Sequence, residues 1–145
     1  MYSMKANELR IGNYVAAEGY INCPNFRVDE IRLTDWGYVL RCYPSGDVQI
    51  YLDAPLDMVE PIRLTPGILE ACGFELDGKG EWRYVAINYT NIYYLAPSLY
   101  TAGAEWGVSV NVEECILRPA IICIYLHNLQ NKFYAITGKE LDVKW

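Results

Sequence analysis

Residues 124–141 read IYLHNLQNKFYAITGKEL and contain a clear helical pattern. Apolar side chains recur in this stretch at spacings of three or four, at Leu126, Leu129, Phe133 and Ile136. This spacing places them along one side of a helix, and Gly138 suits the position just after its last turn. The stretch therefore predicts an amphipathic C-terminal helix that packs its apolar side against the rest of the fold.

The start of this helix is left open by the sequence. Pro119 separates the segment from the strand-like run before it. The run AIICIY at residues 120–125 contains enough β-branched side chains to form a strand. The helix therefore begins either near Ala120 or, after a short strand, near Tyr125.

Residues 1–64 are expected to form the first structural unit. From residue 11 onward, short strand-like runs alternate with turn residues, and WGYVLRCY and VQIYL flank the turn PSGD. Small β-rich units commonly curl into a partly closed barrel, because closure removes exposed strand edges. The pattern predicts an SH3-like β-barrel unit.

Residues 65–145 are expected to form a short helix, an antiparallel sheet and the C-terminal helix. Thr65 and Pro66 suit the start of the short helix, and Gly73 suits its end. The runs EWRYVAINY and NIYYLAP predict a hairpin, and GVSVNV a third strand of the same sheet. We expect the C-terminal helix to pack against this sheet. The fold class is then α+β, with both units in one compact domain.

The charge balance bears on the class of partner. Lys and Arg number 12 against 18 Asp and Glu, which gives a net charge of −6. Such a field repels phosphate backbones and disfavours nucleic acid. A nucleic-acid-binding face on the SH3-like unit is therefore only the alternative hypothesis, with Arg27, Arg32 and Arg41 as its candidate residues.

Cysteine spacing and hydropathy bear on the compartment. The chain has 5 cysteines and no Cys-x-x-Cys pair, so neither a disulfide framework nor a zinc site is indicated. The stretch MYSMKANELR lacks the apolar core of a signal peptide, and the longest apolar run, AIICIYL, is too short to span a bilayer. We expect a cytoplasmic protein with reduced thiols and no membrane association.

His127 is the single histidine, so any imidazole chemistry depends on it. In a longer helix Cys123 would lie one turn away and could form a Cys–His pair with it. A reactive thiolate, however, needs an electropositive setting, and Cys123 stands in the most apolar run of the chain. Zinc needs three or four ligands. We therefore expect a hydrogen-bonded His127 and predict no catalytic residue, metal or cofactor.

Two groups of residues are candidates for an interaction surface. The first is on the C-terminal helix and consists of His127, Asn128, Gln130 and Asn131. The second consists of Tyr93, Tyr94, Tyr100 and Trp106. The amides either recognise a partner or only solvate the helix, and the tyrosines either form a patch or cover both faces of a sheet. An exposed aromatic patch more often marks a protein partner than a sugar or a base.

Three stretches carry a resemblance to a known family. They are MKANELRIGNYV at 4–15, PIRLTPGILEACGF at 61–74 and YLHNLQNKFYAITGKEL at 125–141. Together they resemble the small uncharacterised proteins of Bacteroidetes genomes and of their phages or other mobile elements. The chain departs from that family at Asn128, where glutamine is usual, and at Pro66 and Gly67, where acidic residues are usual. The resemblance implies a mobile-element setting but no reaction or ligand.

These observations lead to an ordered set of hypotheses about function. The first is a non-enzymatic interaction or adaptor module that binds a protein partner or itself. It depends on the abundance of Tyr and Trp and on the lack of catalytic motifs. Nucleic-acid association through the SH3-like unit comes second. An enzyme of unknown type comes third.

Overall fold

The protein has an α+β fold, as the sequence predicted. The computed structural model describes residues 4–17, 25–44, 51–76, 82–85, 91–97, 106–112, 115–123 and 125–145. The chain divides into two units. The first comprises Met1–Arg63 and Tyr125–Glu140, and the second comprises Leu64–Ile124 and Leu141–Trp145. Each unit therefore combines two segments that are far apart in the sequence.

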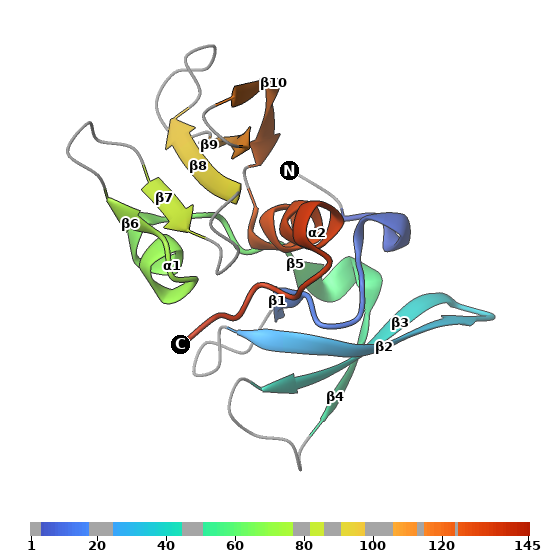
Figure 1. Ribbon diagram of the computed structural model, residues 1–145. Coiled ribbons are helices and arrows are strands. Elements are labelled where there is room, and N and C mark those ends of the chain that lie inside the picture. Colours follow the sequence, from blue (N-terminus) through green and yellow to red (C-terminus); the bar gives the residue numbers. More distant parts are fainter. Residues whose placement is uncertain are drawn as a thin grey trace. The chain divides into compact units, whose positions relative to one another are not determined.

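The first unit is built around an antiparallel sheet (Figure 1). Its elements, in which η marks a 3-10 helix, are η1 (Ala6–Glu8), β1 (Tyr14–Ala17), β2 (Phe26–Thr34), β3 (Gly37–Pro44), β4 (Leu52–Pro55), η2 (Leu56–Met58), β5 (Val59–Glu60) and α2 (Leu126–Thr137). The strands pair in the order β4-β3-β2-β1-β5, and every pair is antiparallel.

This sheet is open among the described residues, so the closure expected of a barrel is not confirmed for the first unit. Strands β4 and β5 form its two edges, and no pairing joins them among the described residues. Strand β5 is only two residues long and pairs with the end of β1 through Ala16 and Ala17. Neither the length of β5 nor its pairing with β1 was visible in the sequence.

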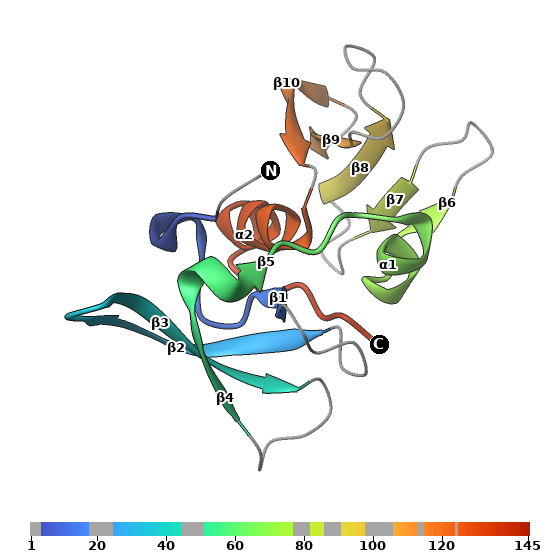
Figure 2. The ribbon, with the colours of Figure 1, turned by 180° about the vertical axis from the view of Figure 1, so that it is seen from behind.

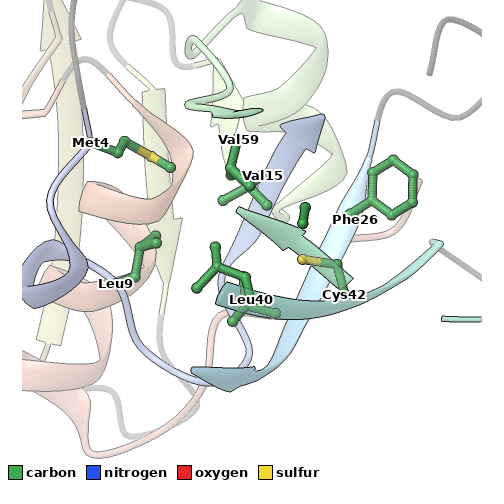
Figure 3. Close-up of a cluster of buried hydrophobic side chains, with 9 residues drawn as sticks. Met4, Leu9, Val15, Phe26, Leu40, Cys42 and Val59 are labelled. Atoms are coloured by element: carbon green, nitrogen blue, oxygen red, sulfur yellow. The ribbon is translucent and has the colours of Figure 1, made fainter. Parts of the chain in front are cut away.

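The core of the first unit lies on one face of this sheet (Figure 3). Its buried members are Met4, Leu9, Val15, Phe26, Val28, Leu40, Cys42, Ala54 and Val59. Along β2 and β3 buried and more exposed residues alternate, because successive side chains of a strand point to opposite faces. Removal of these side chains from water is the main source of stability for the unit.

Strands β2 and β3 form a long ribbon with one irregularity. Val28 pairs with Cys42, but the next pair is Glu30 with Arg41, so Asp29 is an extra residue, a β-bulge. The bulge shifts the alternation of β2 by one position. Ile31 therefore packs against the core, and Leu33, two residues further on, lies on the same face.

The second unit contains a short helix and a second antiparallel sheet (Figure 1). Its elements are α1 (Pro66–Ala71), β6 (Glu75–Leu76), β7 (Trp82–Val85), β8 (Asn91–Pro97), β9 (Trp106–Val112) and β10 (Cys115–Cys123). The strand order is β10-β9-β8-β7-β6. The predicted β7–β8 hairpin and the third strand β9 are confirmed.

Helix α1 forms as its local sequence predicts. The Thr65 hydroxyl accepts a hydrogen bond from the Ile68 N–H at 3.2 Å and so caps the first turn. Pro66 occupies the first helical position, where its missing N–H has no cost. Gly73 follows the helix with a φ of 90°, a conformation that other residues rarely adopt.

Helix α2 resolves the ambiguity about its start. Residues 115–123 form a strand, so the helix begins at Leu126 with Tyr125 as its N-cap. It ends at Gly138, as predicted, where φ is 72° and the N–H donates to the Tyr134 carbonyl. Pro119 is accommodated in β10 where the pairing with β9 shifts register, between Leu117 and Ile121.

The position of α2 corrects a second expectation. We predicted that it packs against the second sheet, but it belongs to the first unit and lies beside β1 (Figures 1 and 2). Its Leu126 N–H donates to the Ile62 carbonyl at 2.8 Å. Leu126, Leu129 and Phe133 are buried, as their spacing predicted. The polar residues between these three form the hydrogen bonds that hold α2 beside β1, as described below.

Two glycine substitutions test these helix ends in opposite directions. Gly138→Ala should lower the free energy of unfolding by about 1 kcal/mol, because its positive φ strains an L-residue although a Cβ there meets no atom within 4 Å. Gly67→Ala in α1 should raise it by about 0.5 to 1 kcal/mol, since its Cβ makes only an ordinary contact with Thr65. Urea unfolding of both variants measures the difference, and a shift of the same sign in both would contradict it.

Candidate functional site

Buried polar side chains link the beginning of the first unit to helix α2. In the part of the chain whose side chains are described, the polar residues with almost no exposed surface are Asn13, His127 and Gln130. A buried polar group is costly unless it is hydrogen-bonded. The partners of these three groups therefore show what holds the two segments together.

Gln130 binds the backbone of the segment that leads into β1. Its Oε1 accepts a hydrogen bond from the Tyr14 N–H at 2.9 Å, and its Nε2 donates to the Gly12 carbonyl at 3.1 Å. One amide thus pairs with both a donor and an acceptor of the main chain. We call Gln130, with Asn131 and Asn13, the amide clamp.

Asn131 completes the amide clamp one residue further along the helix. Its Oδ1 accepts from Asn13 Nδ2 at 2.8 Å and from Arg10 Nε at 3.2 Å. Its Nδ2 donates to the Glu8 carbonyl at 2.8 Å. Asn13 Oδ1 in turn accepts from the Arg10 N–H at 2.7 Å. Asn13, Asn131 and Arg10 therefore bond to one another in a network, while Gln130 binds the adjacent backbone.

Arg10 covers the outer side of the amide clamp. Its guanidinium forms a bidentate pair with the Glu140 carboxylate, with Nη2 and Oε2 3.0 Å apart. The carbon of the guanidinium lies 4.1 Å from the centre of the Tyr134 ring. The hydrogen bonds to Glu140 raise the pKa of Arg10, so this charge is permanent. Arg10 thus ties the residues after α2 to the N-terminal segment.

His127 is fully buried beside the clamp. Its ring stacks on Tyr125, with centroids 5.9 Å apart. Nε2 lies 3.3 Å from Asn128 Nδ2 and 4.0 Å from the Glu8 carboxylate. Because an amide nitrogen only donates, Nε2 accepts and the proton of the neutral ring lies on Nδ1. Nδ1 has no hydrogen-bond partner among the described residues.

Burial controls the charge of the candidate nucleophiles and bases. It lowers the pKa of His127, and the Glu8 carboxylate opposes this effect only in part. It raises the pKa of the Cys42 thiol and of the Cys72 thiol to about 12, with smaller contributions from nearby aspartates. At neutral pH the ring and both thiols are uncharged, and none of the three groups is exposed to a substrate.

The predicted interaction residues are divided between the two units of the chain. Gln130 is buried and Asn131 is bonded within the fold, so the proposed amide face is in large part internal, and Asn128 is half-buried. The prediction of a wet or docking face thus fails for Gln130, because its amide has to satisfy backbone groups. Tyr93, Tyr94 and Trp106 lie on β8 and β9, and their side chains, like Tyr100 as a whole, lie outside the described residues.

A surface that sequence reasoning missed lies at the end of the β2–β3 ribbon. Leu33 and Tyr38 are a cross-strand pair, and Trp36 stands in the turn between the strands. Their exposed fractions are 71% for Leu33, 98% for Trp36 and 42% for Tyr38. We call these three residues the hairpin tip. The signal was present in the sequence as a tryptophan in a two-residue turn, between Thr34 and Gly37.

The turn that carries Trp36 is well defined. The Thr34 hydroxyl donates to the Gly37 carbonyl at 2.7 Å and accepts from the Trp36 N–H at 3.2 Å. Gly37 has a φ of 112°, which an L-residue rarely adopts. The exposed tryptophan is thus held on an ordered turn.

The opposite face of the ribbon carries charges that compensate one another. Arg32 and Arg41 both bond to the Asp53 carboxylate, and both lie near the Glu30 carboxylate, at 3.3 and 3.7 Å. The hydrogen bonds with Arg41 lower the pKa of Asp53 and raise that of Arg41. The guanidinium carbon of Arg41 also lies 4.1 Å from the centre of the Tyr51 ring. These four charged residues, here called the charged quartet, have no net charge.

Comparisons with protein-family models, with curated proteins and with solved structures gave no match to this chain. In the part of the chain that the structure describes, no group of three or more His, Cys, Asp or Glu side chains is arranged to hold a metal ion. The helices described include none that is long and apolar enough to cross a bilayer. A proposal about function therefore depends on the geometry of the described residues and on the sequence itself.

The amide clamp can be tested with one substitution. Gln130→Leu leaves a side chain of similar size but removes both hydrogen bonds of the Gln130 amide, to the Tyr14 N–H and to the Gly12 carbonyl. Each of the two lost bonds costs about 1 to 3 kcal/mol, so the free energy of unfolding should fall by about 2 to 6 kcal/mol. Lys132→Leu, at an exposed position of the same helix, is the matched control and should change it little. Equal effects of the two variants in urea unfolding would contradict the role of Gln130.

His127 should make stability depend on pH. Its pKa is lower in the folded than in the unfolded protein, so the unfolded protein binds more protons as the pH falls below about 6.5. The free energy of unfolding should therefore decrease from pH 7.5 to pH 5.5, by about 1.4 kcal/mol for each pH unit between 6.5 and the folded-state pKa. Guanidinium unfolding of the wild type and of His127→Gln measures this slope. A slope that the substitution leaves unchanged would exclude His127 as its source.

Proposed function

We propose that this chain is a non-enzymatic interaction module that contacts a protein partner through the hairpin tip. The observation that carries the proposal is Trp36, which is 98% exposed on a turn held by two Thr34 hydrogen bonds. The resemblance of three sequence stretches to proteins of Bacteroidetes and their mobile elements supports a setting in such an element.

The energetics of recognition support this use of Trp36. Tryptophan and tyrosine are enriched among the residues that dominate binding energy, because each buries a large area with few rotatable bonds. Side-chain and loop ordering is one of the costs of association. A turn that is already ordered avoids part of that cost. Leu33 and Tyr38 extend the contact on the side of the ribbon that also covers the core.

We also propose an SH3-like fold for the first unit. Its strand order, β4-β3-β2-β1-β5, supports this proposal, as does the 3-10 helix η2 between β4 and β5. In such a fold the last short strand returns to pair with the first. A fold of this kind hosts many unrelated functions, so it does not decide among the hypotheses.

The other two hypotheses have less support from the site. Two of the three arginines that were candidates for nucleic-acid binding, Arg32 and Arg41, are neutralised within the charged quartet. Phosphate contacts would require them to be free of that pairing. For an enzyme, the only imidazole belongs to His127, which is fully buried.

Capture from a lysate of the cells that naturally express the chain tests the proposal. The tagged full-length wild type, Trp36→Ala and Lys132→Ala are compared by quantitative mass spectrometry. One protein or a few should be recovered with the wild type and with Lys132→Ala, and at least about tenfold less with Trp36→Ala. Because Trp36 is exposed, its removal should leave the unfolding midpoint unchanged. Equal recovery with Trp36→Ala, or no specific recovery at all, would contradict the proposal.

A further inference from the structure

We propose that the hairpin tip inserts into a concave apolar pocket on a different protein, and that the rim of this pocket carries Lys or Arg. This inference rests on the proposed function, since it assigns the chemistry of the partner to the same surface. It follows from the shape of the ribbon, from the area it exposes and from the charge at its end.

The shape of the tip favours a concave acceptor. The β2–β3 ribbon extends beyond β1, β5 and α2 of its own unit, and both views show its end projecting from them (Figures 1 and 2). The pair Ile31–Leu40 still covers the core, whereas the next pair on that face, Leu33–Tyr38, is exposed. The apolar stripe thus continues past the core onto a narrow, convex end. A convex end makes close contact only with a hollow surface.

The exposed area argues against a second copy as the occupant. The hairpin tip exposes on the order of 400 to 500 Å², against about 800 Å² that one partner contributes to a standard interface. Two tips that met about a twofold axis would therefore bury too little surface for a stable dimer. A pocket also contacts the flanks of an inserted ribbon, and those flanks supply the remaining area.

The charge at the tip indicates the rim of the pocket. Glu30, Arg32 and Arg41 are balanced within the charged quartet. Asp35 stands next to Trp36 in the turn, is exposed, and has no ion pair within the described ranges. The chain as a whole carries −6. A basic rim would pair with Asp35 and be attracted by the whole chain, whereas an acidic rim would be repelled.

The same charges disfavour the other acceptors of an exposed tryptophan. Trp and Tyr do occur at membrane interfaces, but Asp35 at the apex would have to leave water and would be repelled by anionic lipids. Nucleic acid would be repelled by Asp35 and by the net charge of the chain. A protein pocket with a basic rim is the acceptor that agrees with the shape, the exposed area and the charge of the hairpin tip.

Affinity measurements with the captured partner test this inference. Full-length chain carrying Asp35→Lys should bind about three- to tenfold more weakly than wild type at low salt, and the difference should shrink at high salt. Asp57→Lys makes the same charge change at an exposed position in η2 and is the matched control. A photo-crosslinking residue at position 33 should mark a segment of the partner that contains apolar residues with Lys or Arg beside them.

Each other result has a defined meaning. Tighter binding by Asp35→Lys, or equal loss with Asp57→Lys, would overturn the basic rim and leave the proposed function intact. A dimer in sedimentation equilibrium that Trp36→Ala abolishes would make a second copy the occupant. Binding to phosphatidylcholine vesicles that Trp36→Ala abolishes would make it a lipid surface. If no partner is captured, or if capture ignores Trp36, the proposed function fails together with this inference.

Discussion

The two hydrogen bonds of the Gln130 side chain determine how the first unit is assembled. They fix the Gly12 carbonyl and the Tyr14 N–H, which are the backbone groups at the entry to β1. Strand β1 lies between β2 and β5, so its position sets the positions of both neighbours. A helix that contributed only apolar side chains would leave those backbone groups unpaired, and such groups are expensive to bury. The polar spacing within α2 therefore matters as much as its apolar stripe.

The amide clamp also gives a physical meaning to two of the three stretches singled out in the sequence. One stretch contributes Arg10, Gly12 and Asn13, and the other contributes Gln130 and Asn131. Residues that look like a site when read along the chain prove to bond with one another. Their hydrogen bonds hold the N-terminal segment against α2. The interaction surface proposed above, the hairpin tip, consists instead of side chains that are exposed.

Local sequence signals predicted most of the helices and strands. They did not predict which segments that are distant in sequence contact one another. Thr65 and Gly138 were recognised because capping depends on neighbouring residues alone. The sequence did not decide whether residues 120–125 form a strand or the start of the helix, because periodicity alone cannot distinguish a short apolar strand from a buried helical segment. The bonds of Gln130 could not be foreseen, since its partners lie more than a hundred residues away in sequence. Trp36 was read as an ordinary strand residue because exposure is a property of the assembled fold.

The composition of the first unit from two distant segments has a consequence for the timing of folding during synthesis. Residues 1–63 leave the ribosome first, but the helix that completes their unit follows only after residues 64–124. Closing a loop of this length costs about 1.6 kcal/mol more than closing one of ten residues. Until α2 is made, the backbone at the entry to β1 therefore lacks the two hydrogen bonds that Gln130 supplies. While residues 64–124 are being made, the first unit lacks its helix, and we expect this to be the interval in which binding of a chaperone has the largest effect on its folding.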